Sequence, residues 1–280
     1  MELKFTKMQG IGNDYIYLDG FSQNLSRIDE SALARVMSQR RFSVGSDGVI
    51  FLYPTPDADV EMRMYNADRS RGEICGNGLR CVAKYCHDAW RVPGDTLRIK
   101  TDAGIRVAHL IVTGGEVTFV TVGMGRAQTM PGKIPILGDS HRFTITAQDR
   151  TFEMFACSVG NPHGVTFLQS LDLDVERYGR LLGRDRMFPG GANISFARPL
   201  RSGVLQARVW ERGSGETMAC GSGACAIATA AVEEGYAEVG IPVTVLLPGG
   251  NLTVTVAPDG EITLGGPAVT VYRGVYTWEV

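Results

Sequence analysis

Two short stretches of sequence decide the fold: Cys75-Gly76-Asn77-Gly78 and Cys220-Gly221-Ser222-Gly223. Each places a cysteine and two glycines directly before an alanine-containing run of helical character. The first turn of a helix has unpaired N–H groups and carries the positive end of the helix dipole, so a cysteine there can be held as a thiolate. The glycines let N–H groups approach an anion closely, so the same turn can bind a carboxylate. Each stretch therefore predicts a reactive thiol beside an anion-binding turn.

The landmarks upstream of the two cysteines repeat as well. Asn66 lies nine residues before the first cysteine and Glu211 nine residues before the second. Gly12-Asn13 and Gly160-Asn161 precede them at intervals of 62 and 59 residues, counted from the asparagines. The same three landmarks thus occur twice in the chain, in the same order and at nearly the same spacing, which indicates an internal duplication. We expect a first half formed by residues 1–122 with 268–280, which carries Cys75, and a second half of residues 123–267, which carries Cys220.

The rest of the chain is typical of an α+β protein. Many short β-branched or alternating runs end at Gly, Pro, Asp or Asn, and they do not alternate with helices as a doubly wound sheet would require. Helices are expected only at residues 29–40, 77–88, 174–182 and 223–234. The strands that stand out most are Ile16–Leu18, Val49–Tyr53, Val60–Tyr65, Thr96–Lys100, Val117–Val122, Val204–Trp210, Val243–Leu247, Leu252–Val256 and Val269–Tyr272.

Composition excludes several classes of function. The 280 residues carry a net charge of −2, which argues against a dedicated nucleic-acid or anionic-membrane surface. No apolar run approaches the roughly 18 residues of a membrane span, and the first residues lack an apolar signal segment. We therefore expect a cytoplasmic protein with a small-molecule substrate and neither nucleic-acid nor membrane partners.

Six cysteines in a reducing compartment are not expected to form structural disulfides. Cys81, Cys86, Cys157 and Cys225 fall on or near apolar positions and are expected to be packing residues. No Cys-x-x-Cys pair exists and the four histidines do not cluster, so no metal is expected. No phosphate-loop or dinucleotide fingerprint appears, and none of the five lysines lies in a phosphate-cup setting, so no cofactor is expected either.

A pair of such thiols suits one reaction in particular. If one thiolate removes a proton from carbon and a thiol on the opposite face returns one, the stereochemistry at that carbon inverts. The glycine turns would hold the adjacent carboxylate while negative charge develops. A binding protein, in which the turns merely hold a carboxylate or phosphate, is the alternative of a different class; it predicts no exchange of the substrate's α-hydrogen with solvent.

The sequence resembles the diaminopimelate epimerase family over nearly the whole chain. The resemblance implies two pseudo-symmetric α+β halves, each a mainly antiparallel, barrel-like sheet around a central helix, with the active site in the cleft between them. It also implies cofactor-independent interconversion of LL- and meso-diaminopimelate, in lysine and peptidoglycan precursor biosynthesis, and leaves a homodimer open. The motifs that carry it are Lys7–Tyr15, Gly45–Gly48, Met64–Asp68, Cys75–Cys81, Gly160–His163, Trp210–Thr217 and Ala219–Cys225.

The resemblance assigns roles to individual residues. Cys75 and Cys220 would be the two acid/base thiols, and His163 and Glu211 would tune their pKa values. An Arg can bind a carboxylate through two parallel hydrogen bonds and a Glu can bind an ammonium group. The residues expected to bind substrate are Asn13, Asn66, Gly76, Asn77, Asn161, Asn193, Glu211, Arg212, Gly221 and Ser222.

The sequence departs from the family pattern at Gly48, Arg69, Arg71, Gly190, Gly191 and Ser195. These departures concern the identity of the substrate more than the mechanism. A related cofactor-independent racemase of another amino acid, such as histidine, is therefore the alternative within the same class. Asn66, Asn193, Glu211 and Arg212 favour a substrate with a second amino-acid head group, hence diaminopimelate.

Overall fold

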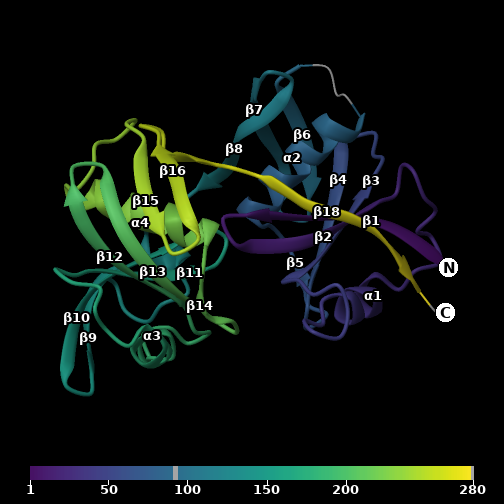
Figure 1. The fold of residues 1–280 in the computed structure, drawn as a ribbon. Coiled ribbons are helices and arrows are strands. Elements are labelled where there is room, and N and C mark those ends of the chain that lie inside the picture. The colour runs from purple at the N-terminus through teal and green to yellow at the C-terminus, as the bar shows by residue number, and fades with distance from the viewer. Residues whose placement is uncertain (91–93, 279–280) are drawn as a thin grey trace. The chain divides into compact units, whose positions relative to one another are not determined.

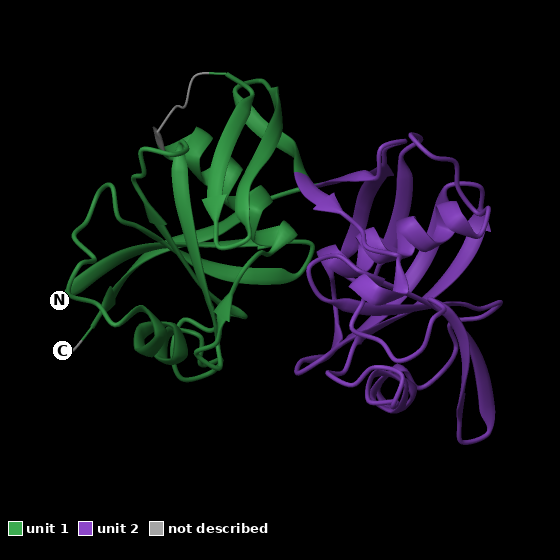
Figure 2. Cartoon of the chain, turned by 180° about the vertical axis from the view of Figure 1, so that it is seen from behind, with its two compact units in different colours: residues 1–122, 266–280 green, residues 123–265 purple. Residues whose placement is uncertain are grey.

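The computed structural model describes residues 1–90 and 94–278. The chain divides into two compact units (Figure 2): unit 1 is residues 1–122 with 266–280, and unit 2 is residues 123–265. The second unit is thus inserted into the first in the chain order. The C-terminal segment returns to unit 1 because its last strand pairs along the first strand of the chain.

Unit 1 is a mixed, mainly antiparallel sheet. The strands lie in the order β18, β1, β2, β3, β4, β6, β7, β8, and the small strand β5 also pairs with β4. Among these pairs, within the described residues, only β2/β3 and β4/β6 are parallel. Figure 1 shows these strands in purple to teal, with yellow β18 beside β1. Their bounds are β1 (Glu2–Gly10), β2 (Asn13–Asp19), β3 (Gly48–Tyr53), β4 (Val60–Asn66), β5 (Arg71–Gly72), β6 (Thr96–Thr101), β7 (Gly104–Thr113), β8 (Glu116–Arg126) and β18 (Val269–Thr277).

Two helices complete unit 1. Helix α1 (Glu30–Met37) begins where the Asp29 side chain accepts the N–H of Ala32 at 3.0 Å, a standard N-cap. Helix α2 (Gly76–Trp90) buries Leu79, Val82, Ala83 and Cys86, which recur at the spacing of one helix face. This face packs on β1, β2, β6 and β7, strands from opposite ends of the sheet order, so the sheet curls around α2.

Unit 2 repeats this topology strand for strand. Its order is β9, β10, β11, β12, β13, β15, β16, β17, with β14 on β13, and here too only two pairs, β11/β12 and β13/β15, are parallel. Each parallel pair occupies the place of its counterpart in unit 1. The bounds are β9 (Arg142–Ala147), β10 (Arg150–Ser158), β11 (Pro162–Phe167), β12 (Asn193–Arg201), β13 (Val204–Glu211), β14 (Gly215–Thr217), β15 (Val243–Leu247), β16 (Gly250–Val256) and β17 (Glu261–Gly266).

The helices of unit 2 follow the same plan. Helix α3 (Val175–Gly183) is capped by Asp174, as α1 is by Asp29, and connects β11 to β12. Helix α4 (Gly221–Glu233) is buried on nearly every side because small residues from Gly223 to Ala231 let the strands approach it from all directions. It packs on β10, β11, β12, β15 and β16 (Figure 1) and is the core of the unit.

The described residues contain four α-helices and one short 3₁₀ helix, η1 (Pro131–Lys133). The expected α+β fold of two similar halves, each a mainly antiparallel sheet around a helix, is confirmed. The four expected helices are confirmed, with ends that differ by up to three residues. In the part of the chain that the structure describes, no helix is long and apolar enough to span a membrane.

Candidate active site

Cys75 lies immediately before α2, at the junction predicted from its glycine turn. Its carbonyl accepts the N–H of Leu79 at 2.8 Å, and its sulfur accepts the N–H of Gly78 at 3.3 Å. The thiol therefore satisfies one of the N–H groups that the first helical turn leaves without a partner. The residue is only partly buried.

Cys220 lies in the same way before α4 and is the N-cap of that helix. Its carbonyl accepts the N–H of Ala224 at 2.9 Å and its sulfur accepts the N–H of Gly223 at 3.3 Å. The hydroxyl of Ser222 lies 3.6 Å from the sulfur. The two cysteines thus share one local geometry, although Cys220 is buried, with 4% of its surface exposed.

The surroundings of Cys220 disfavour a charged sulfur. Burial raises the pKa of Cys220 well above its usual value, and the neighbouring Glu211 carboxylate raises it further. The hydrogen bonds from Ser222 and Gly223 act in the opposite direction but do not outweigh burial. Burial therefore favours the thiol form of Cys220, whereas its position before a helix favours the thiolate.

Asn13 connects Cys75 to a network of charged residues. Its Oδ1 accepts hydrogen bonds from the Cys75 thiol at 3.4 Å and from the Asn77 amide at 3.2 Å. Its Nδ2 donates to Asp47 at 2.6 Å, which fixes the orientation of the amide. Arg40 bridges Asp47 and Asp14, at 2.9 and 2.5 Å.

Asp14 is held in turn by the buried Lys7, whose ammonium lies 2.6 Å from the carboxylate and also donates to the carbonyl of Gly45. Burial raises the pKa of Asp14, but the hydrogen bonds from Arg40 and Lys7 outweigh it and keep that pKa below the usual value. Asp14 is therefore ionised at neutral pH, and the network holds Asn13 rigidly in front of the Cys75 thiol.

Asn77 is oriented from the other side by Arg80, which is completely buried. An Arg80 Nη2 group donates to Asn77 Oδ1 at 2.8 Å, and its Nε donates to the carbonyl of Pro267 at 3.3 Å. The strand residue opposite is Gly10, where a Cβ atom would lie 2.9 Å from the guanidinium. The buried Arg80 thus fixes the orientation of Asn77 in the turn after Cys75. Arg80 is not among the site residues predicted from the sequence.

Asn66 closes β4, where its backbone pairs with Gly48. Its side-chain amide donates to the Ser70 hydroxyl at 2.9 Å, within the turn that leads toward Cys75. Asn66 and Cys75 are therefore carried by one strand-turn-helix segment. No described contact joins the side chain of Asn66 directly to that of Cys75.

In unit 2, Asn161 and His163 form a pair. The imidazole Nε2 lies 2.9 Å from Asn161 Oδ1, and the ring is completely buried. Burial lowers the pKa of His163 to about 3, so its imidazole is neutral at physiological pH. His163 can tune its neighbours only as a neutral hydrogen-bonding group and not as a cation.

The remaining predicted residues of unit 2 gather at the ends of β12 and β13. Asn193 Oδ1 accepts the backbone N–H of Arg212 at 2.8 Å, and the Arg212 guanidinium donates to the carbonyl of Gly190. Glu211 accepts the hydroxyl of Thr217 at 2.5 Å and acts on the Cys220 thiol. The glycine-rich turn in which the sequence departs from the family thus supplies the carbonyls that hold Arg212.

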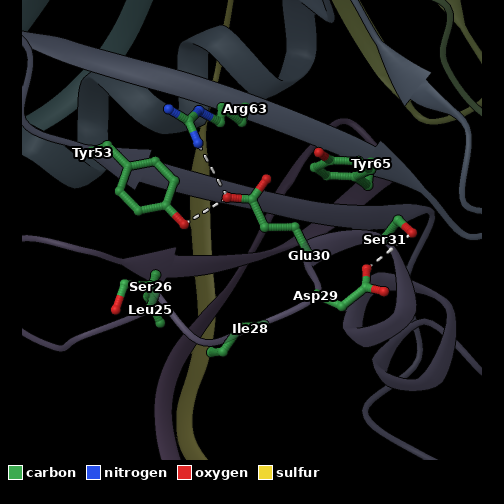
Figure 3. A pocket seen from close by; sticks show the side chains of 9 residues that line it. All are labelled: Leu25, Ser26, Ile28, Asp29, Glu30, Ser31, Tyr53, Arg63 and Tyr65. Carbon is green, nitrogen blue, oxygen red and sulfur yellow. Dashed lines mark hydrogen bonds and ion pairs between the residues drawn. The ribbon is translucent and has the colours of Figure 1, made fainter.

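A surface hollow of about 690 Å³ lies elsewhere in unit 1, around the start of α1 (Figure 3). Its Glu30 carboxylate accepts the Tyr53 hydroxyl at 2.7 Å and lies 3.5 Å from Arg63. These polar groups pair with one another, and the lining contains no predicted site residue. We therefore do not assign a function to this hollow. Within residues 1–90 and 94–278, no group of three His, Cys, Asp or Glu side chains could hold a metal ion.

Comparison with solved structures defines the class of the fold. The chain matches a probable proline racemase from Agrobacterium radiobacter with a TM-score of 0.74 at 15% identity, covering 99% of this chain and 93% of that one. It matches a phenazine biosynthesis protein of the PhzF family from Bacillus anthracis with a TM-score of 0.71 at 16% identity, covering 99% and 100%. At these identities the likeness concerns the fold alone, which this chain shares with both proteins.

Sequence comparison identifies the family within this class. The diaminopimelate epimerase from Desulfovibrio desulfuricans is 43% identical over 98% of each chain. That from Methanococcus maripaludis is 41% identical over 97% of this chain and 99% of its own. The sequence model of diaminopimelate epimerase matches residues 5–130 and 155–278. The chain therefore belongs to the diaminopimelate epimerase family, as its motifs indicated.

Proposed function

We propose that this protein is an isomerase that interconverts LL- and meso-2,6-diaminopimelate by exchange of the hydrogen at one α-carbon. The observation that carries the proposal is the duplicated thiol. Cys75 and Cys220 head equivalent helices of two equivalent units, and each sulfur accepts an N–H at 3.3 Å. Family membership at about 40% identity over nearly the full length supports the choice of substrate.

In the proposed reaction the two thiols have opposite tasks. The sulfur of one cysteine, as a thiolate, takes the proton from the α-carbon, and the thiol of the other gives a proton to the opposite face. The proton count is unchanged, and the second cysteine is left as the thiolate. In the reverse direction the roles exchange, so each cysteine serves one enantiomer at the reacting centre.

The turns beside the thiols support the same reaction. Backbone N–H groups at Gly76-Asn77 and Gly221-Ser222 would bind the carboxylate of the reacting centre and stabilise the charge that develops toward it. We assign recognition of the amino and carboxylate groups to the side chains that the units hold in fixed orientations. These are Asn13, Asn66, Asn161, Asn193, Glu211 and Arg212.

Tuning of the thiols is assigned to Glu211 and His163. The high pKa of Cys220 means that this cysteine starts as the proton donor unless a base takes its proton. Glu211 is the carboxylate that acts on it. His163 remains neutral and orients the Asn161 amide. The reaction needs free thiols, so we also propose that the protein works in the reducing cytoplasm.

The test is turnover of purified protein in D₂O, monitored by ¹H NMR and chiral chromatography. With LL-diaminopimelate we expect formation of the meso isomer together with loss of the α-hydrogen signal. L-Histidine is the matched alternative substrate, and turnover of histidine alone would assign the protein to the other racemase class. Tight binding of diaminopimelate without exchange would instead favour a binding protein.

A further inference from the structure

The duplication places Tyr15 at the position that His163 occupies in unit 2. Each lies two residues after the asparagine of a Gly-Asn turn. Tyr15 pairs with Gly48, the first residue of β3, and His163 pairs with Asn193, the first residue of β12. Both strand pairs are parallel and equivalent in the two sheets. Tyr15 is therefore the counterpart of a residue already assigned to tuning a thiol.

The two units place a different pair of side chains at this position: a large ring opposite glycine in unit 1, and a smaller ring opposite a full side chain in unit 2. Tyr15 is buried, with 6% of its surface exposed. A Cβ atom on Gly48 would lie 2.9 Å from the Tyr15 ring and 2.2 Å from the carbonyl oxygen of Tyr65. In unit 2 the smaller His163 ring faces a full side chain at Asn193. Gly48, one of the departures noted in the sequence, thus makes the space that the larger tyrosine ring requires.

The hydroxyl of Tyr15 reaches the reactive cysteine. Tyr15 lies two residues after Asn13 on β2, so both side chains lie on the same face of the strand. Asn13 Oδ1 accepts the Cys75 thiol at 3.4 Å, and the Tyr15 hydroxyl interacts with the side chains of both Cys75 and Asn13. Burial raises the pKa of Tyr15 well above its usual value, so the phenol keeps its proton at any working pH. The hydroxyl can therefore donate to the sulfur without itself acting as a base.

We propose that Tyr15 is a positioning residue whose hydroxyl donates a hydrogen bond to Cys75 Sγ and stabilises the thiolate of that cysteine. The proposal deepens the proposed function and rests on the role given there to Cys75. When Cys75 gives its proton to the α-carbon, negative charge remains on the sulfur, and the O–H of Tyr15 would donate to that charge. Hydrogen bonds to charged groups are worth more than those between neutral groups, so the interaction favours the charged state.

Other groups also act on this site. Asp47 precedes β3 and raises the pKa of Tyr15 by its charge, and Cys75 itself interacts with Tyr17 on β2 and Cys81 on α2. Burial raises the pKa of Cys81 to about 11, so it remains neutral, and burial keeps Tyr17 neutral as well. Two charged groups are close to this site: Asp47, whose side chain is held by Arg40 and Asn13, and the buried Arg80 on α2, which donates to Asn77 at 2.8 Å.

The test is the Tyr15→Phe variant, which removes the hydroxyl and keeps the ring in its space beside Gly48. The readout is the rate of iodoacetamide alkylation at Cys75 as a function of pH, followed by peptide mass spectrometry. We expect the pH midpoint of this rate to rise by about one unit, since a hydrogen bond to a charged group of about 1.5 kcal/mol corresponds to that shift. We also expect kcat/KM to fall about tenfold.

Tyr53→Phe is the control. Tyr53 lies on β3 of the same unit, and its hydroxyl donates to Glu30 at the start of α1 at 2.7 Å. The loss of this hydrogen bond should lower the melting temperature without moving the Cys75 midpoint. If Tyr15→Phe lowers the melting temperature as Tyr53→Phe does and leaves the midpoint in place, Tyr15 is only structural and the proposal is wrong.

A second measurement avoids dependence on the fold of the variant. Biosynthetic replacement of all nine tyrosines by 3-fluorotyrosine gives more acidic phenols and stronger donors, so the Cys75 midpoint should fall. The same replacement in Tyr15→Phe should leave the midpoint of that variant in place. An unchanged midpoint in the fluorinated wild-type protein, or an equal fall in the fluorinated variant, contradicts the proposal. The alkylation readout does not require turnover. If the protein lacks epimerase activity but its Cys75 midpoint still shifts, the proposed function is wrong and the assignment of Tyr15 stands. If the protein is an active epimerase but its Cys75 midpoint does not move, the proposed function stands and the assignment of Tyr15 is wrong.

Discussion

The space at Gly48 allows one perturbation to be worked out in detail. In Gly48→Ala the new Cβ would lie 2.2 Å from the Tyr65 carbonyl oxygen, 2.9 Å from the Tyr15 ring and 3.1 Å from the Asn66 Cα. Two of these three neighbours are backbone atoms of β4, which cannot rotate away. Strand β3 must therefore separate from β4 by roughly 1 Å, judged against ordinary van der Waals contact distances.

Overpacking of this kind is destabilising by about 1–3 kcal/mol, and the contact with backbone places Gly48→Ala at the upper end of that range. For a domain of this size each kcal/mol corresponds to about 2–4 °C, so 2–3 kcal/mol lowers the melting temperature by about 4–12 °C. The shift also displaces the Tyr15 ring and the end of β4 that carries Asn66. We therefore expect kcat/KM to fall by more than tenfold even at temperatures where the variant is fully folded.

The assay combines differential scanning calorimetry with epimerase activity at 20 °C. Gly132→Ala is the control, because a Cβ there meets no atom within 4 Å and its backbone is not in the left-handed region. If Gly48→Ala has the wild-type melting temperature and the wild-type kcat/KM, the claim that only glycine fits beside the Tyr15 ring at this position is wrong.

Three further predictions follow from the charged and buried groups. Asp47→Ala removes the acceptor that holds the Asn13 amide, so kcat/KM should fall about tenfold. Asp47→Asn restores an acceptor and should recover part of the lost kcat/KM. Equal losses of kcat/KM in the two variants would contradict this prediction. The His163 imidazole should stay neutral from pH 8 to pH 5 in ¹⁵N NMR spectra. Its pKa of about 3 in the folded protein lies below the unfolded value of about 6.5, so below that pH the unfolded chain binds the proton more readily and the stability of the folded protein should decrease. The pKa of Asp14 is also lowered, so its contribution to folding stability is present above about pH 4 and is lost on further acidification. In Asp14→Asn, the free energy of unfolding measured with urea should depend less on pH in this acidic range.

The cysteine turns could be predicted from sequence because their determinants are local. The glycines permit a tight turn, the alanine-containing run after them favours a helix, and both helices begin there. The equivalence of the two halves was also visible, because the spacing of asparagine, strand end and cysteine is nearly the same in both. The structure extends that equivalence to the two parallel strand pairs of each unit, which no local pattern specifies.

Several strands could not be predicted for identifiable reasons. Strands β5 and β14 have two and three residues, too few for any alternation to show. Strand β7 exposes residues on both faces over much of its length, so it lacks the period of a half-buried strand. Such strands are specified by the neighbours with which they pair.

Two features of the candidate site depend on burial, which sequence does not reveal. The high pKa of Cys220 results from its desolvation beside Glu211, whereas its position before a helix favours the opposite shift. Tyr15 reads in the sequence as an ordinary strand residue, and the role that we propose for it depends on its burial beside Gly48 and its interaction with Cys75. The one signal that could have identified it is the matching interval from Asn13 to Tyr15 and from Asn161 to His163.

Solvent-hydrogen exchange by the two single-cysteine variants tests the central claim most directly. Cys75→Ser and Cys220→Ser would each be incubated in D₂O with LL- and, separately, meso-diaminopimelate, and both deuterium at the α-carbon and isomer ratio would be measured. Two thiols acting on one carbon predict that each variant loses interconversion in both directions, while the wild-type product carries solvent deuterium at the inverted centre. Interconversion at the wild-type rate by either variant would contradict the account.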